Sequence, residues 1–350
     1  MFSWKWYLSE LPEPKQDAPT VFSCFSCGGG STMGYKRNGF RVLGNVEIDP
    51  AMNKIYVANN HPKYNFNMDI RDFNNLPNDK IPEELFHLDI LDGSPPCTTF
   101  STAGDREKTW GKEKQFREGQ KKQTLDDLSF VFLQTVEKLK PKVVIMENVT
   151  GLMKGNAKGY VNEIVKRFRE IGYDVQIFRL NSAFMEVPQT RERVFFVANN
   201  QHYPKIKMQF NYKPIFFKEI KSANGKSIPA SDNIYSAYQL LKLRKPSDKC
   251  IGDINERIYH RVSNYNARIL HDEDVCDTLT ASGCRYRYCD ATLASDNDLI
   301  SMQSFPQDYQ FLGQNVQYVC GMSVPPNMMA HVAKEVYSQW LMPEKDTLQK

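Results

Sequence analysis

The sequence predicts an α/β fold: a Rossmann-like parallel sheet covered on both faces, followed by a smaller domain of irregular or β-rich structure. From Val21 to about Ala198, short apolar runs alternate with amphipathic stretches of helical period, as in βαβ units. After Asn200 this periodicity is lost, and the chain becomes basic, aromatic-bearing and interrupted by proline and glycine. A chain of 350 residues with 41% hydrophobic residues can bury a substantial core, which excludes the disordered and fibrous classes.

The apolar runs place the expected elements in order along the chain. Helices are predicted where apolar residues recur at spacings of three and four, at Leu125–Leu139 and Val161–Ile171, and near the end from Met328 to Trp340. Strands are predicted at Thr20–Phe25, Val42–Ile48, Leu88–Leu91, Val143–Met146, Val175–Leu180 and Val194–Val197. We therefore expect an N-terminal extension (1–20), a main domain (21–200), a smaller domain (201–288) and a C-terminal segment (289–350) that packs back on the main domain.

The positive charge of the chain is local. The formal net charge is only +4, but residues 201–250 hold ten Lys or Arg against three Asp or Glu. The rest of the chain is therefore slightly acidic, and whole-chain charge does not identify a nucleic-acid partner.

The eight cysteines are scattered rather than arranged as a disulfide framework, which favours a reducing compartment. No signal peptide or run of about 18 apolar residues is present, so we expect a cytoplasmic protein with no membrane partner. Cys24 and Cys27 form a C-x-x-C pair but lack a second pair of ligands, so we expect no metal.

A glycine-rich turn, Phe25 to Gly30, follows the first expected strand, and Glu47 lies at the end of the next. Such glycines let the backbone approach a ligand, and an acidic side chain about 20 residues on can hold a ribose hydroxyl pair. By itself, a turn of this kind is more often only a tight turn.

Two further strand ends carry reactive side chains. Pro95 and Pro96 fix the backbone before Cys97, which suits a nucleophile, although a single cysteine is more often structural. Glu147 follows the strand Val143–Met146, where desolvation could make its carboxyl group a proton donor; the alternative is a surface Glu.

The last motif precedes the strand Val194–Val197. Alternate residues of an extended segment share a face, so Gln189, Arg191 and Arg193 are expected to project together and bind an anion or a carbonyl oxygen. Alone, two arginines entering a strand more often form a solvated or ion-paired edge.

In order and spacing, these four motifs resemble the cytosine-5 DNA methyltransferase family, of bacterial or phage type, over about Phe22 to Val336. Further matching segments are Met68-Asp69-Ile70, Leu128, Gln303-Ser304-Phe305-Pro306 and Val324-Pro325-Pro326. The chain departs from the family pattern at Cys27, Thr98 and Met322, the last of which concerns contacts near the cofactor.

The resemblance implies an AdoMet-dependent methyltransferase sheet with a target-recognition domain at 201–288. It implies that Cys97 adds to carbon 6 of a flipped-out cytosine, with Glu147 at ring nitrogen 3, Arg193 at the carbonyl oxygen and Arg191 in support. Residues 98–122 would form a mobile loop over the base. The implied AdoMet-binding residues are Phe25, Gly28, Gly29, Gly30, Glu47, Ile48, Asp69, Ile70, Pro96, Leu128 and Ser323.

The expected partner is double-stranded DNA, bound by a monomer, with a separate cognate restriction endonuclease as a further partner in a restriction–modification system. Three alternatives remain: an RNA cytosine-5 methyltransferase, an inactive AdoMet- or DNA-binding module, and an amino-group methyltransferase. The last requires an aromatic residue after the two prolines, where this chain has Cys97.

Overall fold

The computed structural model describes residues 1–96, 128–153, 157–263 and 266–342, and the chain divides into two compact units. The first, here called the sheet unit, comprises Leu11–Asn181, Glu192–Gln209 and Met328–Lys350. The second, the loop unit, comprises Met1–Glu10, Ser182–Arg191 and Phe210–Asn327. The domain borders expected from the sequence remain a prediction.

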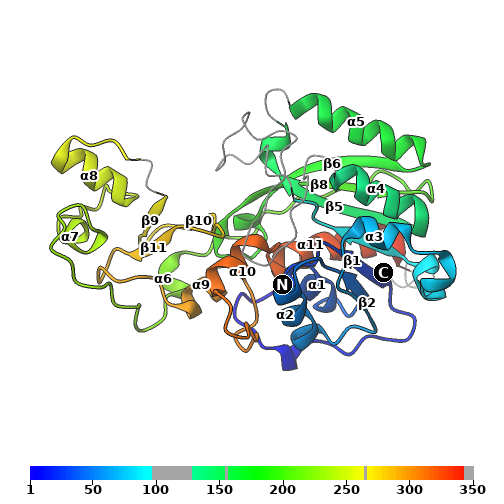
Figure 1. Ribbon diagram of the computed structural model, residues 1–350, viewed down its shortest axis with the longest axis horizontal. Coiled ribbons are helices and arrows are strands. Elements are labelled where there is room, and N and C mark those ends of the chain that lie inside the picture. The colour runs from blue at the N-terminus through cyan, green and yellow to red at the C-terminus, as the bar shows by residue number, and fades with distance from the viewer. Residues whose placement is uncertain (97–127, 154–156, 264–265, 343–350) are drawn as a thin grey trace. The chain divides into compact units, whose positions relative to one another are not determined.

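A seven-stranded sheet organises the sheet unit, in the order β3-β2-β1-β4-β5-β8-β6 (Figure 1). Its strands are β1 (Thr20–Cys24), β2 (Arg41–Val46), β3 (Tyr64–Phe66), β4 (Ile90–Gly93), β5 (Val143–Val149), β6 (Asp174–Asn181) and β8 (Glu192–Asn199). This confirms the predicted α/β class and Rossmann-like sheet.

The sheet is parallel, as predicted, except at β8, which runs antiparallel to both β5 and β6. A parallel connection needs a crossover of a dozen or more residues, usually a helix. Only residues 182–191 join β6 to β8, and they hold a single 3-10 turn (Ser182–Phe184) and the two-residue strand β7 (Gln189–Thr190).

Helices cover both faces of the sheet (Figure 1). On one face, α3 packs on α4 and α4 on α5; on the other, Asn38, just after α1, donates a hydrogen bond to the carbonyl of Ala330 in α11. The helices are α1 (Gly30–Lys36), α2 (Pro50–Asn60), α3 (Ile70–Asn75), α4 (Leu128–Leu139), α5 (Ala157–Glu170) and α11 (Pro326–Val336), which continues as a π-helix (Tyr337–Leu341). Short 3-10 turns lie at Asn78–Lys80, Glu83–His87 and Thr150–Met153. The first residues of the predicted helix Leu125–Leu139 lie outside the described residues.

A continuous apolar core lies between the sheet and the α3, α4 and α5 layer. Phe22 of β1 stacks on Phe73 of α3, with ring centroids 5.8 Å apart, and Phe132 of α4 and Phe168 of α5 are completely buried. This core fixes the carboxyl ends of the parallel strands, where the predicted motifs lie.

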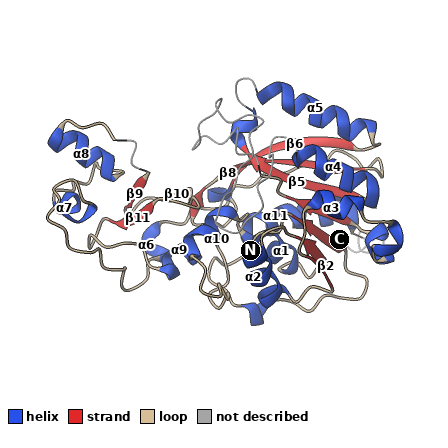
Figure 2. Cartoon of the chain, in the orientation of Figure 1, coloured by secondary structure: helices blue, strands red, loops and turns tan. Residues whose placement is uncertain are grey.

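The loop unit consists of short elements joined by long irregular segments (Figure 2). Two parallel ladders pair β7 with β10 (Cys276–Asp277) and β9 (Ala267–Leu270) with β11 (Cys284–Arg287). Its helices are α6 (Phe217–Ile220), α7 (Ala237–Lys242), α8 (Ile251–Tyr259), α9 (Asp296–Met302) and α10 (Val316–Met322), with a 3-10 turn at Leu8–Glu10. A second apolar core, which includes Leu240, Leu241, Ile254 and Ile269, lies within this unit. Buried apolar contacts therefore stabilise the loop unit in addition to its loop contacts.

The first ten residues of the N-terminal extension, Met1–Glu10, pack within the loop unit. Trp6 is buried, and its indole Nε1 donates a 2.9 Å hydrogen bond to the carbonyl of Ser304. The amide of Gln307 in turn donates to the carbonyl of Trp6 at 2.8 Å. The first residues of the chain therefore contribute to the core of this unit.

Candidate active site

The glycine turn between β1 and α1 has an unusual backbone. Phe25 and Cys27, which are not glycines, adopt positive φ angles of 55° and 46°, and Gly29 follows at 89°. Left-handed conformations of residues with a Cβ are costly and occur mostly where the surrounding structure enforces them, often at functional sites. Gly28, Gly29 and Gly30 are buried, and the Gly29 amide donates to the carbonyl of Ser26 at 2.8 Å.

Glu47 follows β2 and faces the turn. Its two carboxylate oxygens accept hydrogen bonds from the amide of Cys27, at 2.7 Å, and the amide of Asp49, at 2.8 Å. The side chain is buried, and burial raises the pKa of Glu47 to about 7, although the amide donors oppose this shift. Ile48, the next residue, is half-buried.

Asp69 lies at the end of the neighbouring connection and caps α3. Its carboxylate accepts a hydrogen bond from the amide of Arg71 at 2.8 Å, and Ile70 is buried as the first residue of the helix. The sheet unit therefore brings the turn, Glu47 and Asp69 to the carboxyl edge of three adjacent parallel strands.

The segment after β4 leads to Cys97, which lies outside the described residues. Pro95 is buried and Pro96 half-buried, and Asn148 of β5 donates an Nδ2 hydrogen bond to the carbonyl of Pro95 at 3.2 Å. Leu128, another predicted cofactor residue, is the buried first residue of α4.

Glu147 and Arg193 form a buried ion pair on adjacent antiparallel strands. Arg193 Nε lies 2.8 Å from Glu147 Oε1, and the two side chains are only 14% and 9% exposed. Burial lowers the pKa of Arg193, whereas the neighbouring carboxylate opposes that shift. The structure thus brings together two of the four predicted catalytic residues, at the end of β5 beside the Pro95 contact.

Arg191 belongs to the loop unit, although it is only two residues from Arg193. Its guanidinium donates to the carbonyls of Leu279 at 2.9 Å and of Gly321 and Ser323 at 3.1 Å. Gln189 is also fully buried and donates to the carbonyl of Met302. These side chains hold loop-unit backbone, and Ser323 itself is the buried C-cap of α10.

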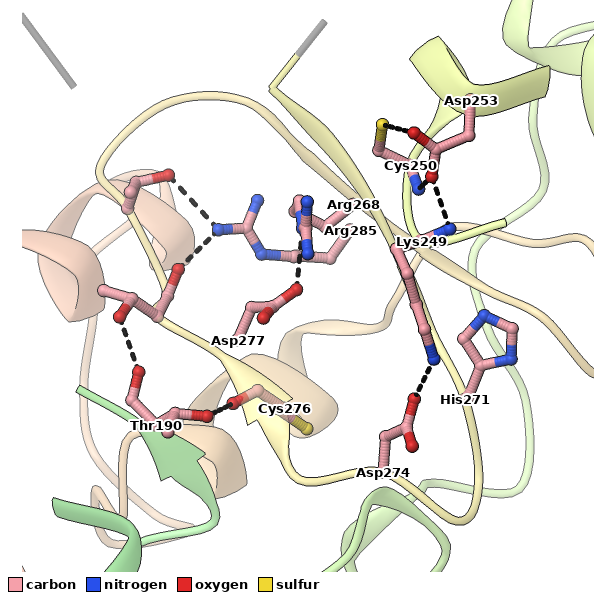
Figure 3. Close-up of polar contacts among 12 residues, drawn as sticks. Thr190, Lys249, Cys250, Asp253, Arg268, His271, Asp274, Cys276, Asp277 and Arg285 are labelled. Carbon is pink, nitrogen blue, oxygen red and sulfur yellow. Dashed lines mark hydrogen bonds and ion pairs between the residues drawn. The ribbon is translucent and has the colours of Figure 1, made fainter. Parts of the chain in front are cut away.

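Polar contacts also organise the predicted recognition region (Figure 3). Arg285 is buried and donates to the carbonyl of Thr278 at 2.6 Å, while Arg268 pairs with Asp277 at 2.6 Å. Tyr286 is buried in β11, and β11 pairs in parallel with β9.

Asp92 is a residue that the motifs did not identify. It lies in β4, is 1% exposed, and accepts hydrogen bonds from the hydroxyls of Ser23, Ser31 and Tyr35. The signal in the sequence was a carboxylate inside an otherwise apolar strand, Ile90–Gly93.

Within the described residues, every helix is too short or too polar to cross a bilayer.

Comparisons with known proteins agree with this geometry. The chain is 30% identical over 342 residues to the type II methyltransferase M.Sau96I of Staphylococcus aureus, covering 90% of this chain and 75% of that one. It is 26% identical over 336 residues to the type II methyltransferase M1.HphI of Haemophilus parahaemolyticus, covering 91% and 86%.

Among solved structures, the methyltransferase EhMeth of Entamoeba histolytica has the same fold, with a TM-score of 0.62, 16% identity and coverage of 96% of this chain and 100% of that one. The family model for the C-5 cytosine-specific DNA methylases matches residues 20–338, which include the glycine turn, Glu147 and Arg193. The chain therefore belongs to the C-5 cytosine-specific DNA methylase family and is a DNA (cytosine-5) methyltransferase.

Proposed function

We propose that the protein methylates carbon 5 of a flipped-out cytosine within a specific DNA sequence, through a covalent Cys97 adduct, and yields 5-methylcytosine and AdoHcy. The buried Glu147–Arg193 pair carries this proposal, because it places a carboxyl group and a guanidinium beside the Pro95–Pro96 segment that leads to Cys97. A cytosine ring offers matching groups, a basic nitrogen 3 and a carbonyl oxygen.

The chemistry requires covalent help, because carbon 5 of cytosine is a poor nucleophile. The Cys97 thiolate adds to carbon 6, a sulfur–carbon bond forms, and the displaced electron pair makes carbon 5 nucleophilic. Glu147 stabilises the charge on the ring at nitrogen 3, and Arg193 holds the carbonyl oxygen. After methyl transfer, a base removes the carbon 5 proton and the returning electron pair expels the Cys97 thiolate.

AdoMet supplies the methyl group as an electrophile. The residues of the carboxyl edge fit such a molecule, since Phe25 and Cys27 of the turn are held in left-handed conformations and Glu47 presents a buried carboxylate beside them. Glu47 would hold the ribose hydroxyls and Asp69 the adenine, with Phe25, Gly28–Gly30, Ile48, Ile70, Pro96, Leu128 and Ser323 as the remaining contacts.

The target base must leave the helical stack, because carbon 6 is inaccessible inside a duplex. Residues 201–288 would select the sequence, and their lysines and arginines would bind phosphates, contacts that position rather than specify. Since the relatives are named type II methyltransferases, we place the enzyme in a restriction–modification system, acting as a cytoplasmic monomer beside a separate endonuclease.

Duplex DNA with fluorine at carbon 5 of the target cytosine tests the mechanism. Fluorine cannot leave as a cation, so with AdoMet present the enzyme should remain bonded in a complex that survives denaturation and maps to Cys97. Cys97→Ser is the control and should give no such complex. A wild-type enzyme that methylates ordinary DNA but is never trapped would contradict the covalent step, and efficient trapping on fluorinated transfer RNA alone would favour an RNA substrate.

A further inference from the structure

The buried carboxylate of Asp92 accepts hydrogen bonds from three hydroxyl groups of the sheet unit. Its Oδ2 accepts hydrogen bonds from Ser23 Oγ at 2.9 Å and Ser31 Oγ at 2.8 Å, and its Oδ1 accepts one from Tyr35 Oη at 3.1 Å. All four side chains are buried. The cluster therefore joins three elements, β1, α1 and β4, through one side chain.

An ionised carboxylate can only accept hydrogen bonds, so it orients all three hydroxyl protons toward itself. A buried polar network in which all three hydrogen bonds to Asp92 form favours one arrangement of β1, α1 and β4. Burial raises the pKa of Asp92 to about 6, and the three hydroxyls oppose that shift. An apolar side chain would fill the same space without the cost of burying a charge.

The network lies between the turn that is expected to bind the methyl donor and the strand end that leads to the nucleophile. Ser23 precedes the turn Phe25–Gly30 and Ser31 follows it, so Asp92 holds both ends of the turn. Asp92 is itself three residues before Pro95, whose carbonyl is fixed from the other side by Asn148. One carboxylate thus couples the expected cofactor turn to the strand end that leads to the nucleophile.

We propose that Asp92 is a positioning residue that aligns the turn Phe25–Gly30 with the end of β4, so that methyl transfer depends on it more strongly than cofactor binding or thiolate addition does. The inference rests on the proposed function, since it concerns the alignment of methyl donor and nucleophile. Misplacement of reacting groups by about 1 Å can slow a reaction about 100-fold while each partner still binds.

Three measurements on Asp92→Ala and Asp92→Asn separate these steps. Calorimetry gives the Kd for AdoMet. Exchange of the carbon 5 hydrogen of the target cytosine with solvent reports thiolate addition and reversal, which need no methyl transfer. Product formation gives kcat for methylation. We expect kcat to fall roughly 10- to 100-fold in Asp92→Ala and less in Asp92→Asn, with Kd and exchange within about threefold of the unmodified enzyme.

Asp89→Asn is the matched control. Asp89 precedes β4 by one residue and anchors the opposite end of β1, accepting from the Thr20 amide at 2.8 Å, and it pairs with Lys142. Its loss should lower stability without changing the ratio of methylation to exchange. Should Asp92→Ala not fold, Ser31→Ala removes one of the three hydrogen bonds and should lower the same ratio by a smaller factor.

Equal losses of methylation, exchange and AdoMet affinity in Asp92→Ala would show that Asp92 is only structural and would overturn the proposal. Methylation by Asp92→Ala at the unmodified rate would overturn it as well. Failure of the proposed function has a different signature, because Cys97→Ser would then still exchange or methylate whatever Asp92 does.

Discussion

Among single residues, Glu47 combines a buried carboxylate with two backbone amide donors, and its pKa of about 7 gives a testable pH dependence. Ribose hydroxyls donate to an ionised carboxylate better than to a neutral acid. We therefore expect the Kd for AdoMet to rise by up to about tenfold from pH 8 to pH 6, because one pKa unit corresponds to a factor of ten. In Glu47→Gln this dependence should be absent and the Kd uniformly weaker, with kcat changed less than the Kd.

Calorimetry across this pH range measures the effect. The stability of the free protein should change with pH in the opposite direction to the affinity for AdoMet. The raised pKa means that the folded state holds its proton more tightly, so the free energy of unfolding should fall by about 3 kcal/mol as pH rises from 4.5 to 7. A pH dependence unchanged by Glu47→Gln would exclude Glu47 from both effects.

The limits of sequence reasoning are also clear at single residues. The turn, Glu47, Asp69 and Glu147 follow from motifs at strand ends, since parallel strands gather their carboxyl ends at one edge. The period-two rule placed Arg191 and Arg193 on one face, but the chain passes between units at Arg191, which binds three loop-unit carbonyls. Asp92 is visible in the sequence as a carboxylate inside an apolar strand, but its contacts could not be predicted, because its hydroxyl partners lie about 60 or 70 residues away in sequence.

Among the elements, the packing of β4 on α4 is tight at Gly93. A Cβ at this position would lie 2.4 Å from Cε2 of Phe132, whose side chain is completely buried. Gly93→Ala should therefore lower the free energy of unfolding by about 1–3 kcal/mol, the usual cost of overpacking a core. The strand end that leads to Cys97 would shift with it, so methylation should fall too.

Gly159→Ala provides the matched comparison. Gly159 lies in α5 with open space around its would-be Cβ, so alanine should stabilise the protein by up to about 1 kcal/mol through its higher helix propensity. Urea denaturation of both variants measures the free energy of unfolding, which should fall in Gly93→Ala and rise in Gly159→Ala. If Gly93→Ala were as stable as the unmodified enzyme, the contact between β4 and α4 would be looser than described.

The order of the strands along the chain could be predicted from the sequence, but the direction of β8 within the sheet could not. Six apolar runs marked six strands of the large sheet, because strands covered on both faces are almost wholly apolar. The antiparallel direction of β8 depends on what residues 182–191 do, and their strand β7 pairs with β10, about 85 residues away. No local pattern reports such a distant partner.

At the scale of the whole molecule, the basic excess of residues 201–250 is partly balanced by later acidic residues. Lys218 pairs with Glu273, Lys249 with Asp274 and Lys226 with Asp296. The side chains of these pairs are about half exposed or more, so each pair contributes little to stability. We expect these lysines to exchange their carboxylate partners for DNA phosphates when DNA is bound. The charge of this region therefore suits phosphate binding but carries no information about sequence.

The proposed role of residues 201–288 in sequence selection can be tested by exchanging this region with that of a related methyltransferase. The exchanged segment should run from residue 210 to residue 294 rather than from 201 to 288. Lys226 and Leu293 donate backbone hydrogen bonds to each other at 2.8 Å, and a junction at residue 288 would separate these two partners. The segment 210–294 carries α7, α8, β9 and β11 with their complete buried core. We expect the hybrid to methylate the donor's sequence, with a kcat within about tenfold of the parents, because the sheet unit and its Glu147–Arg193 pair are unchanged.

Sequencing of 5-methylcytosine in DNA from cells that express each protein reads out the choice of site. A folded, active hybrid that keeps the original site would place recognition outside residues 210–294, whereas one that binds AdoMet normally yet methylates neither site would mean that recognition requires residues from both parents.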